Sequence, residues 1–223
     1  MPRIDDYYNA LNIAQEALRE KNHGEICRNA DIRWDSSKKG GKMTLPFLNR
    51  EVEITYPRGE VVYEGGEESS SLQEQILILH YLLQVRDTFP TGKLITFREI
   101  PSGEFYYEAF LKRAQIPLLN SFGQKPGRLV VVGQKLGGKK ANLGDVSMTF
   151  RPFPKIPLTL VLWRGDEEFP PSGNILFDST IGIFLSGEDI AFLSGAVVYK
   201  LLGKTAGLIK RGYNEQSKGK FQN

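Results

Sequence analysis

The sequence has little of the chemistry from which many protein sites are built. Its 223 residues include one cysteine, Cys27, and two histidines, His23 and His80. One cysteine permits no disulfide within the chain and no metal cluster held by several cysteines. Two histidines and one cysteine supply at most three zinc ligands, so a four-ligand zinc site would need carboxylates. The composition therefore leaves carboxylate oxygens, or a single histidine, as the means of holding a metal.

Long apolar runs are also missing. The chain opens with Met1-Pro2-Arg3-Ile4-Asp5-Asp6, which is acidic at once and lacks the apolar segment of a signal peptide. No stretch approaches the ~18 consecutive apolar residues that a membrane-spanning helix requires. We therefore expect a soluble, cytoplasmic protein with no membrane partner.

The main part of the chain lacks excess charge of either sign. The formal net charge is +3, but residues 203–223 alone hold five Lys and Arg against one acid, Glu215. Residues 1–202 are then almost neutral, whereas a nucleic-acid-binding protein needs a clustered basic face. Nucleic acid is therefore not an expected partner. We expect residues 203–223 to be a basic, flexible C-terminal tail.

Apolar periodicity predicts both helices and strands. Residues 4–20 form an amphipathic helix, and Ser71-Leu72-Gln73-Glu74 is a capping box before a helix from Leu72 to about Arg86. This second helix is apolar on nearly every side and is predicted to be the central buried helix. Further helices are predicted at Gly103–Gln115 and after Ser186-Gly187-Glu188-Asp189. Strands are predicted at residues 42–48, 51–56, 60–63, 94–97, 146–151, 158–163 and 175–177.

The order of these elements predicts the fold class. Strands and helices alternate without a regular βαβ rhythm, which favours α+β over a doubly wound sheet. We predict a single α+β domain, residues 1–202, with a mainly antiparallel sheet of about six or seven strands packed against the central helix and flanking helices. A two-residue connection, Asn49-Arg50, predicts a hairpin between two strands.

A loop between two apolar runs, Leu158–Trp163 and Ile175–Phe177, is the most acidic feature of the sequence. Its carboxylates, with the one that ends the second run, are Asp166, Glu167, Glu168 and Asp178. Such oxygens suit Mg²⁺ or Ca²⁺, and carboxylate pairs suit general acid–base chemistry. Asp166, Glu168 and Asp178 are thus metal-ligand candidates of a metal-dependent enzyme. The alternative is a solvated turn.

His80 is the best isolated candidate for a catalytic or ligand-binding group. It lies in a polar strip of the central helix, with Gln73, Gln84 and Asp87 at helical spacings. Imidazole titrates near neutral pH and binds metals and tetrapyrroles axially. The alternative is that the strip is the least buried face of the helix.

Four more side chains are candidates for lining a pocket beside the acidic loop. They are Arg98, Glu99, Tyr106 and Tyr107. Tyrosines offer a stacking surface and a hydroxyl group, although an aromatic core stripe at helical spacing is the alternative. By contrast, Gly133-Gln134-Lys135-Leu136-Gly137-Gly138-Lys139 only partly matches a phosphate-binding loop, because no hydroxyl residue and no good helix follow it. This segment is interpreted instead as the Gly-Gly end of a helix or strand.

Six sequence blocks together resemble a known family. They are LPFL at 45–48, EQILILHYLL at 74–83, FREIP at 97–101, WRGDEEFPPS at 163–172, LFD at 176–178 and EDIA at 188–191. The family is a domain of unknown function, found mainly in anaerobic bacteria and archaea, and the resemblance spans Asp5 to Leu202. Some members carry an added iron–sulfur cluster segment, like that of corrinoid iron–sulfur proteins. This chain departs from that form, since Cys27 alone cannot ligate a cluster.

The residues and the resemblance together imply a cofactor- or small-ligand-binding accessory protein of anaerobic metabolism. A corrinoid or other tetrapyrrole is the cofactor class that His80 suggests, and an iron–sulfur or corrinoid protein is the implied partner. Two alternatives stay open: the metal-dependent enzyme and a protein-interaction module without catalysis. The resemblance brings no established catalytic residues, and the sequence names neither the ligand nor the reaction.

Overall fold

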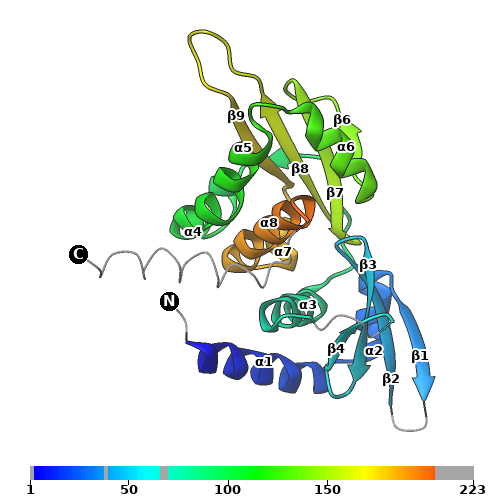
Figure 1. Cartoon of the computed structure of the whole chain (residues 1–223). Coiled ribbons are helices and arrows are strands. Elements are labelled where there is room, and N and C mark those ends of the chain that lie inside the picture. The colour runs from blue at the N-terminus through cyan, green and yellow to red at the C-terminus, as the bar shows by residue number, and fades with distance from the viewer. Residues whose placement is uncertain (1–2, 38–39, 66–69, 204–223) are drawn as a thin grey trace.

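The computed structural model, which describes residues 3–37, 40–65 and 70–203, is an α+β fold with two antiparallel sheets (Figure 1). The predicted fold class is confirmed. The strands form two sheets, however, where one sheet is predicted from the sequence. The first sheet belongs to the N-terminal part of the chain and the second to the C-terminal part, and one hydrophobic core joins them.

Two helices and four strands build the N-terminal part. They are α1 (Ile4–Arg19), α2 (His23–Ala30), β1 (Arg33–Ser37), β2 (Gly40–Phe47), β3 (Arg50–Tyr56) and β4 (Val61–Tyr63), with the strands in the order β1-β2-β3-β4. Helix α2 is absent from the sequence-based assignment. It begins because the side chain of Asn22 accepts a hydrogen bond of 3.0 Å from Glu25 N, which satisfies one of the free amides of the first turn. Strand β1 is also unpredicted, because most of its residues are exposed and it has no apolar alternation.

The β2–β3 hairpin turns one residue earlier than the sequence predicts. Phe47 pairs with Arg50, so the turn residues are Leu48 and Asn49. Both have positive φ, 48° and 62°, as a two-residue hairpin turn with the correct twist requires. Positive φ is unfavourable for leucine. The surroundings hold Leu48 there, since its N–H donates to Pro152 O at 3.1 Å across to the second sheet.

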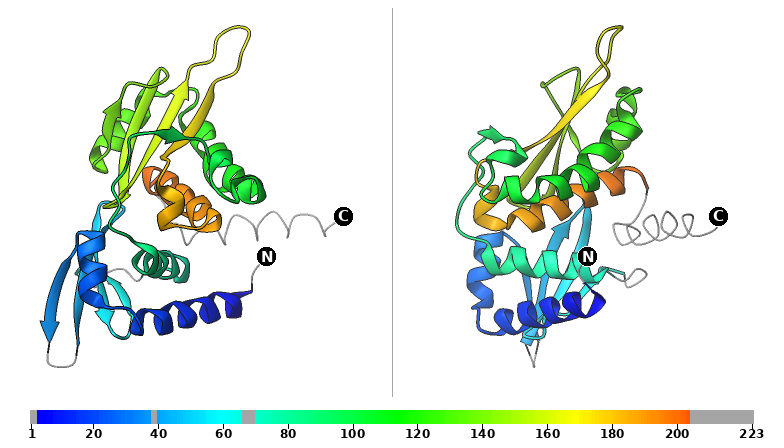
Figure 2. Two further views of the ribbon diagram at one scale, coloured as in Figure 1. Left: turned by 180° about the vertical axis from the view of Figure 1, so that it is seen from behind. Right: turned by 90° about the vertical axis from the view of Figure 1, so that its left-hand side faces the viewer.

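Helix α3 (Leu72–Gln84) is the central helix that the sequence predicts. Its capping box forms as expected: Ser71 Oγ accepts from Glu74 N at 3.2 Å, and the Glu74 carboxylate accepts from Ser71 N at 2.9 Å. Most of its residues are buried. Figure 2 shows α3 lying between α1 and the pair of helices near the C-terminus.

The C-terminal part contains the remaining elements. They are β5 (Leu94–Ile95), a short 3₁₀ turn (Phe97–Glu99), α4 (Gly103–Phe110), a π-helical turn (Leu111–Gln115), α5 (Ile116–Phe122), α6 (Gly127–Lys135), β6 (Lys139–Ala141), β7 (Val146–Phe153), β8 (Ile156–Trp163), β9 (Ser172–Asp178), α7 (Ile181–Phe184) and α8 (Gly187–Leu201). The second sheet has the order β5-β9-β8-β7-β6. The helices α4, α5 and α8 gather beside it (Figure 1).

The π-helical turn inside the α4–α5 helix has a sequence cause. Pro117 has no N–H to donate to Arg113 O, four residues earlier. The helix takes a π-helical turn at Leu111–Gln115, just before this proline, which accommodates the missing bond. The freed carbonyl lies against α8 at Gly195, where an added Cβ would come within 3.0 Å of Arg113 O. Glycine at this position therefore permits the close contact between the two helices.

Aromatic rings and one buried lysine join the two parts of the fold. Tyr81 of α3 stacks on Phe153 of β7 with ring centroids 4.3 Å apart. Lys155 follows in the β7–β8 turn, and its Nζ donates to Arg86 O at 3.2 Å, just beyond the end of α3. Since the Lys155 side chain is only 5% exposed, this bond and the Asp87 carboxylate, 3.9 Å from Nζ, offset the cost of burying an ammonium group.

Within the described ranges, none of the helices combines the length and apolar character needed to cross a membrane. The predicted tail, residues 203–223, lies outside these ranges except for Gly203.

Candidate functional site

The contact between α3 and α8 holds the most distinctive polar pair of the structure. His80 Nδ1 lies 3.0 Å from Asp189 Oδ1 and 3.1 Å from Oδ2, although the two residues are 109 positions apart. The ring N–H can therefore donate to the carboxylate. This bond fixes which ring nitrogen carries the hydrogen and how the imidazole is turned.

Asp189 is itself held by the first turn of α8. Ser186 Oγ donates to Asp189 Oδ2 at 2.7 Å, and Ser186 Oγ accepts from Asp189 N at 3.2 Å. The second of these bonds forms a capping box together with Ser186 N, which donates to Asp189 Oδ2 at 3.4 Å, and the sequence predicts a cap at this place. The same carboxylate thus caps a helix and orients a histidine. The sequence predicts the first role and gives no sign of the second.

The second ring nitrogen of His80, Nε2, makes no hydrogen bond with the residues that the structure describes. The His80 side chain is 33% exposed, against 11% for Asp189. One nitrogen is consequently fixed by the protein while the other has a free lone pair or proton within reach of solvent.

The carboxylates around His80 raise its pKa. The hydrogen bond to Asp189 is the main cause, burial of the ring opposes it, and the charges of Asp189 and Glu188 add to the increase. A raised pKa means that the imidazolium form persists to higher pH than in a free histidine. Binding of a metal at Nε2 must then displace a proton over part of the neutral range.

Asp178 is a structural residue in the described fold. It is 2% exposed. Its carboxylate accepts hydrogen bonds from Thr91 N, Gly92 N and Thr180 N at 3.1, 2.6 and 3.0 Å, and from Thr180 Oγ1 at 2.7 Å. Burial raises its pKa, but these bonds outweigh burial and lower the pKa. With its lone pairs already occupied, Asp178 joins the loop before β5 to the end of β9.

The other three acidic candidates lie in the exposed loop between β8 and β9. Asp166 Oδ1 accepts from Glu168 N at 2.9 Å and from Phe169 N at 2.8 Å, a turn that aspartate commonly forms with its own backbone. These bonds lower the Asp166 pKa. Phe169 is 67% exposed, so this loop is a solvated turn whose aromatic ring does not pack onto the core.

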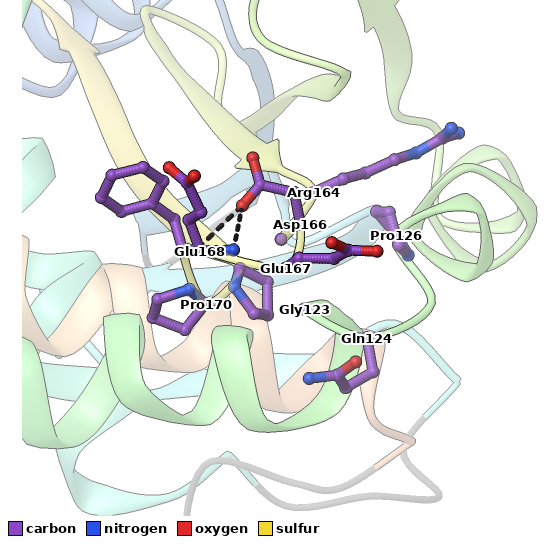
Figure 3. A pocket seen from close by; sticks show the side chains of 11 residues that line it. Gly123, Gln124, Pro126, Arg164, Asp166, Glu167, Glu168 and Pro170 are labelled. Carbon is purple, nitrogen blue, oxygen red and sulfur yellow. Dashed lines mark hydrogen bonds between the residues drawn. The ribbon is translucent and has the colours of Figure 1, made fainter.

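A shallow cavity of about 590 Å³ lies between this loop and the α5–α6 turn (Figure 3). Its lining residues are Gly123, Gln124, Pro126 and Arg164–Pro171. In Figure 3, Glu167 points toward Pro126, whereas Asp166 and Glu168 point to the other side of the loop. The loop carboxylates therefore diverge, as alternation along an extended chain predicts.

These acidic residues do not form a metal site in the described part of the chain. No group of three or more His, Cys, Asp or Glu side chains is placed there to hold a metal ion. Asp178 is buried and fully bonded, while Asp166 and Glu168 are exposed at the far end of a hairpin. The three carboxylates of the metal-dependent alternative are thus not brought together.

None of the four predicted pocket residues, Arg98, Glu99, Tyr106 and Tyr107, lines the cavity beside the loop. The Glu99 carboxylate accepts from Thr96 N at 2.7 Å and from Thr96 Oγ1 at 2.8 Å, which lowers its pKa and caps the 3₁₀ turn. The Arg98 guanidinium lies 4.1 Å above the Tyr107 ring. Tyr106 lies against Gly187 in the first turn of α8, where an added Cβ would come within 3.0 Å of its ring.

The glycine-rich segment at the end of α6 terminates a helix, as interpreted from the sequence. Helix α6 ends at Lys135, and Gly137 follows with φ of 75°. The glycines therefore end a helix, whereas a phosphate-binding loop would precede one.

Comparison with known proteins gives one match. The model of a family described as "Domain of unknown function (DUF3786)" matches residues 22–200. Neither the curated proteins nor the solved structures include a match to this chain.

Proposed function

The chain belongs to the DUF3786 family, a domain of unknown function. From its His80–Asp189 pair, we propose that it is an accessory protein in which one histidine nitrogen binds the metal of a cofactor. The single observation that supports this proposal is an imidazole whose Nδ1 is fixed by Asp189 and whose Nε2 makes no hydrogen bond within the described chain. Metal-ligating histidines usually have this arrangement, with the second nitrogen donating to a carboxylate.

Because His80 has no set of metal ligands around it in the described part of the chain, a metal at this site would need to bring most of its ligands with it, as the metal of a cofactor does. A zinc ion in a protein has three or four protein ligands, and no group of three or more His, Cys, Asp or Glu side chains is placed to hold a metal in the described part of the chain. One imidazole can instead complete the coordination of a metal already held by a macrocycle. A corrinoid or another tetrapyrrole, when bound, would supply a metal with an open axial position. His80 would supply the nitrogen.

The surroundings of His80 favour a cofactor that a partner protein carries. His80 lines neither the cavity under the β8–β9 loop nor the second cavity described below. Its ring reaches solvent at the contact between α3 and α8. This arrangement supports contact with the face of a cofactor whose body rests on another molecule, such as a corrinoid or iron–sulfur partner of anaerobic metabolism.

The proposal is tested by titrating the purified protein with hemin and with cobinamide, a corrinoid without its own nucleotide base. Coordination by imidazole shifts the visible absorption of both, and the shift should saturate at one equivalent per chain. The His80→Ala protein should lose it. His23→Ala is a matched control, since His23 is the other histidine and stacks on Trp34 with centroids 4.2 Å apart.

Two further readouts separate coordination from loss of structure. Asp189→Asn should keep the spectral shift but weaken binding by about 10- to 100-fold, because the partner of a ligating histidine raises its basicity. Affinity of the parent should rise with pH until His80 is deprotonated, and the rise should occur at lower pH in Asp189→Asn. If His80→Ala binds both probes as well as the parent does, the proposal fails.

Native mass spectrometry of protein purified without oxygen addresses the partner. A complex with a second protein that absorbs visible light would support the accessory role. A chain that carries a cofactor in the absence of any partner would contradict the idea that the partner holds the cofactor.

A further inference from the structure

A second cavity, of about 190 Å³, lies where the two sheets meet. Its walls come from four places that are distant in the sequence: the β2–β3 turn, the end of β7, the turn after α6 and the C-terminal turns of α8. The lining residues are Pro46, Leu48, Asn49, Leu136, Gly137, Phe150, Arg151, Pro152, Val197, Lys200 and Leu201. Junctions of this kind are common places for small-molecule sites.

The cavity has apolar walls and two cations. Arg151 and Lys200 line it together, and no carboxylate does. Arg151 Nη1 donates to Pro154 O at 3.3 Å, which leaves other guanidinium N–H groups available. Within the described ranges neither Arg151 nor Lys200 makes an ion pair. The positive charge at this cavity is therefore not neutralised by the protein groups that the structure describes.

The backbone around the cavity is held in an unusual conformation. Leu48 has a φ of 48°, a backbone conformation that is unfavourable for a residue with a branched side chain and that is often found at functional sites. Across the cavity, Gly137 approaches so closely that an added Cβ would lie 2.7 Å from Asn49 Oδ1. Two turns from different parts of the fold are thus fixed against each other, and they give the cavity its shape.

We infer that this cavity binds a small anion with a short apolar body, such as a medium-chain carboxylate or alkyl phosphate. Arg151 and Lys200 contact the anionic head, and the Asn49 carboxamide is placed to donate a further hydrogen bond. Leu136, Phe150 and Val197 contact the apolar body. Because His80 is not among the lining residues, this inference stands apart from the proposed metal-binding role.

The volume sets the size of the ligand. A cavity of about 190 Å³ corresponds to roughly six water molecules at ~30 Å³ each. A methylene group is slightly smaller than a water molecule, so a chain of about six to eight carbons fills the space. The additional carbons of a longer chain must extend out of the cavity into solvent.

The test is an NMR titration of the full-length protein with the straight-chain acids from acetate to decanoate. The amide signals of Asn49, Gly137 and Lys200 should shift together. Affinity should increase by about fourfold for each added methylene, as transfer of that group from water predicts, and should level off near eight carbons. Shifts without dependence on chain length would overturn the inference, since only a surface ion effect would remain.

Matched ligands and variants test the anionic head. Hexan-1-ol should bind at least tenfold more weakly than hexanoate, and hexylamine should not bind. Hexyl phosphate distinguishes a carboxylate from a phosphate preference. Arg151→Gln and Lys200→Gln should each lower hexanoate affinity, whereas Lys140→Gln, on the neighbouring edge strand and outside the cavity, should not. Equal binding of the alcohol and the acid, or equal loss in all three variants, would contradict the assignment.

Discussion

The β8–β9 loop and the contact between α3 and α8 are both acidic, but the structure uses their carboxylates in opposite ways. In the loop, Asp166 accepts hydrogen bonds from the backbone amides two and three residues away. At the helix contact, Asp189 also reaches a histidine that is 109 residues away. The loop has more carboxylates, but the carboxylate that orients a titratable side chain is the one at the helix contact.

This difference shows that a dense run of charge in a sequence does not by itself predict a binding site. In an exposed loop, each of three consecutive carboxylates can turn to water or to its own backbone. A single carboxylate at the start of a helix gives no such signal in the sequence, but packing of the helix places it at a fixed distance from a second group. Asp178 is a third case, in which burial and several donors leave no capacity for a ligand.

The largest effect in this comparison is expected for Asp178→Ala. The change leaves the buried amide of Thr180, and the amides of Thr91 and Gly92 at the exposed loop before β5, without their acceptor. Each such loss costs about 1–3 kcal/mol, and we expect a combined decrease of about 3 kcal/mol in the free energy of unfolding. Urea unfolding measures it. An effect as small as that of the loop variants would show that Asp178 is not a structural residue.

The same carboxylate predicts a dependence on acid. Its pKa is lower in the folded protein than its ordinary value of 3.8. The stabilisation is therefore complete above the ordinary pKa and is lost as pH falls through the folded one. Asp178→Asn should be less stable than the parent at pH 6, and the difference should shrink below pH ~3.5. A constant difference from pH 6 to pH 3 would contradict this linkage.

A smaller effect, of opposite pH dependence, is expected for His80→Gln. Because the pKa of His80 is raised in the folded protein, its ion pair with Asp189 stabilises the fold fully below the ordinary pKa of 6.5. This stabilisation disappears as pH rises through the folded pKa. We expect the variant to be less stable by about 1 kcal/mol at pH 5.5, a value reduced for partial exposure, and nearly equal to the parent at pH 9.

Thermal unfolding of parent, His80→Gln and His23→Gln at the two pH values checks this prediction. The His23 variant is the control, because the His23 ring packs on Trp34 and Tyr56 and makes no ion pair with the residues that the structure describes. A stability gap that does not narrow between pH 5.5 and pH 9 would show that the His80–Asp189 pair does not titrate as an ion pair.

Asp166→Ala should have a still smaller effect. The substitution removes two hydrogen bonds that shape an exposed turn, and losses of this kind cost about 0.5–1 kcal/mol. Urea unfolding beside Asp178→Ala gives the direct comparison. A loss above about 2 kcal/mol, typical of buried groups, would mean that the loop is packed more tightly than its exposure indicates.

The smallest effect is expected for the double change Glu167→Gln and Glu168→Gln. Both side chains are exposed and make no hydrogen bond or ion pair in the described part of the chain. Stability should change by less than about 0.5 kcal/mol. Calorimetry with Mg²⁺, Mn²⁺ and Ca²⁺ should show no binding by parent or variant. Binding that the double variant loses would restore a metal role for this loop.

Much of the local structure could be predicted from the sequence. The capping boxes at Ser71 and Ser186 define where α3 and α8 begin, and the apolar character of α3 predicts its burial. Pairing between strands was harder to predict. Alternating residues identify a strand without saying which edge it meets, so the division into two sheets was missed. The polar strand β1 and the short helix α2 lack the apolar periodicity on which the assignment depends.

The sequence by itself determined the strongly periodic helices and strands, the caps at Ser71 and Ser186 and the identity of His80 as a candidate, because these follow from interactions within a few residues. Only the tertiary structure decided that Asp189 orients His80, that Asp178 is already bonded, and that Arg151 and Lys200 share one cavity. The physical reason is that the chemistry of a side chain depends on its hydrogen-bond partners and its burial. In this fold those partners lie up to 109 residues away.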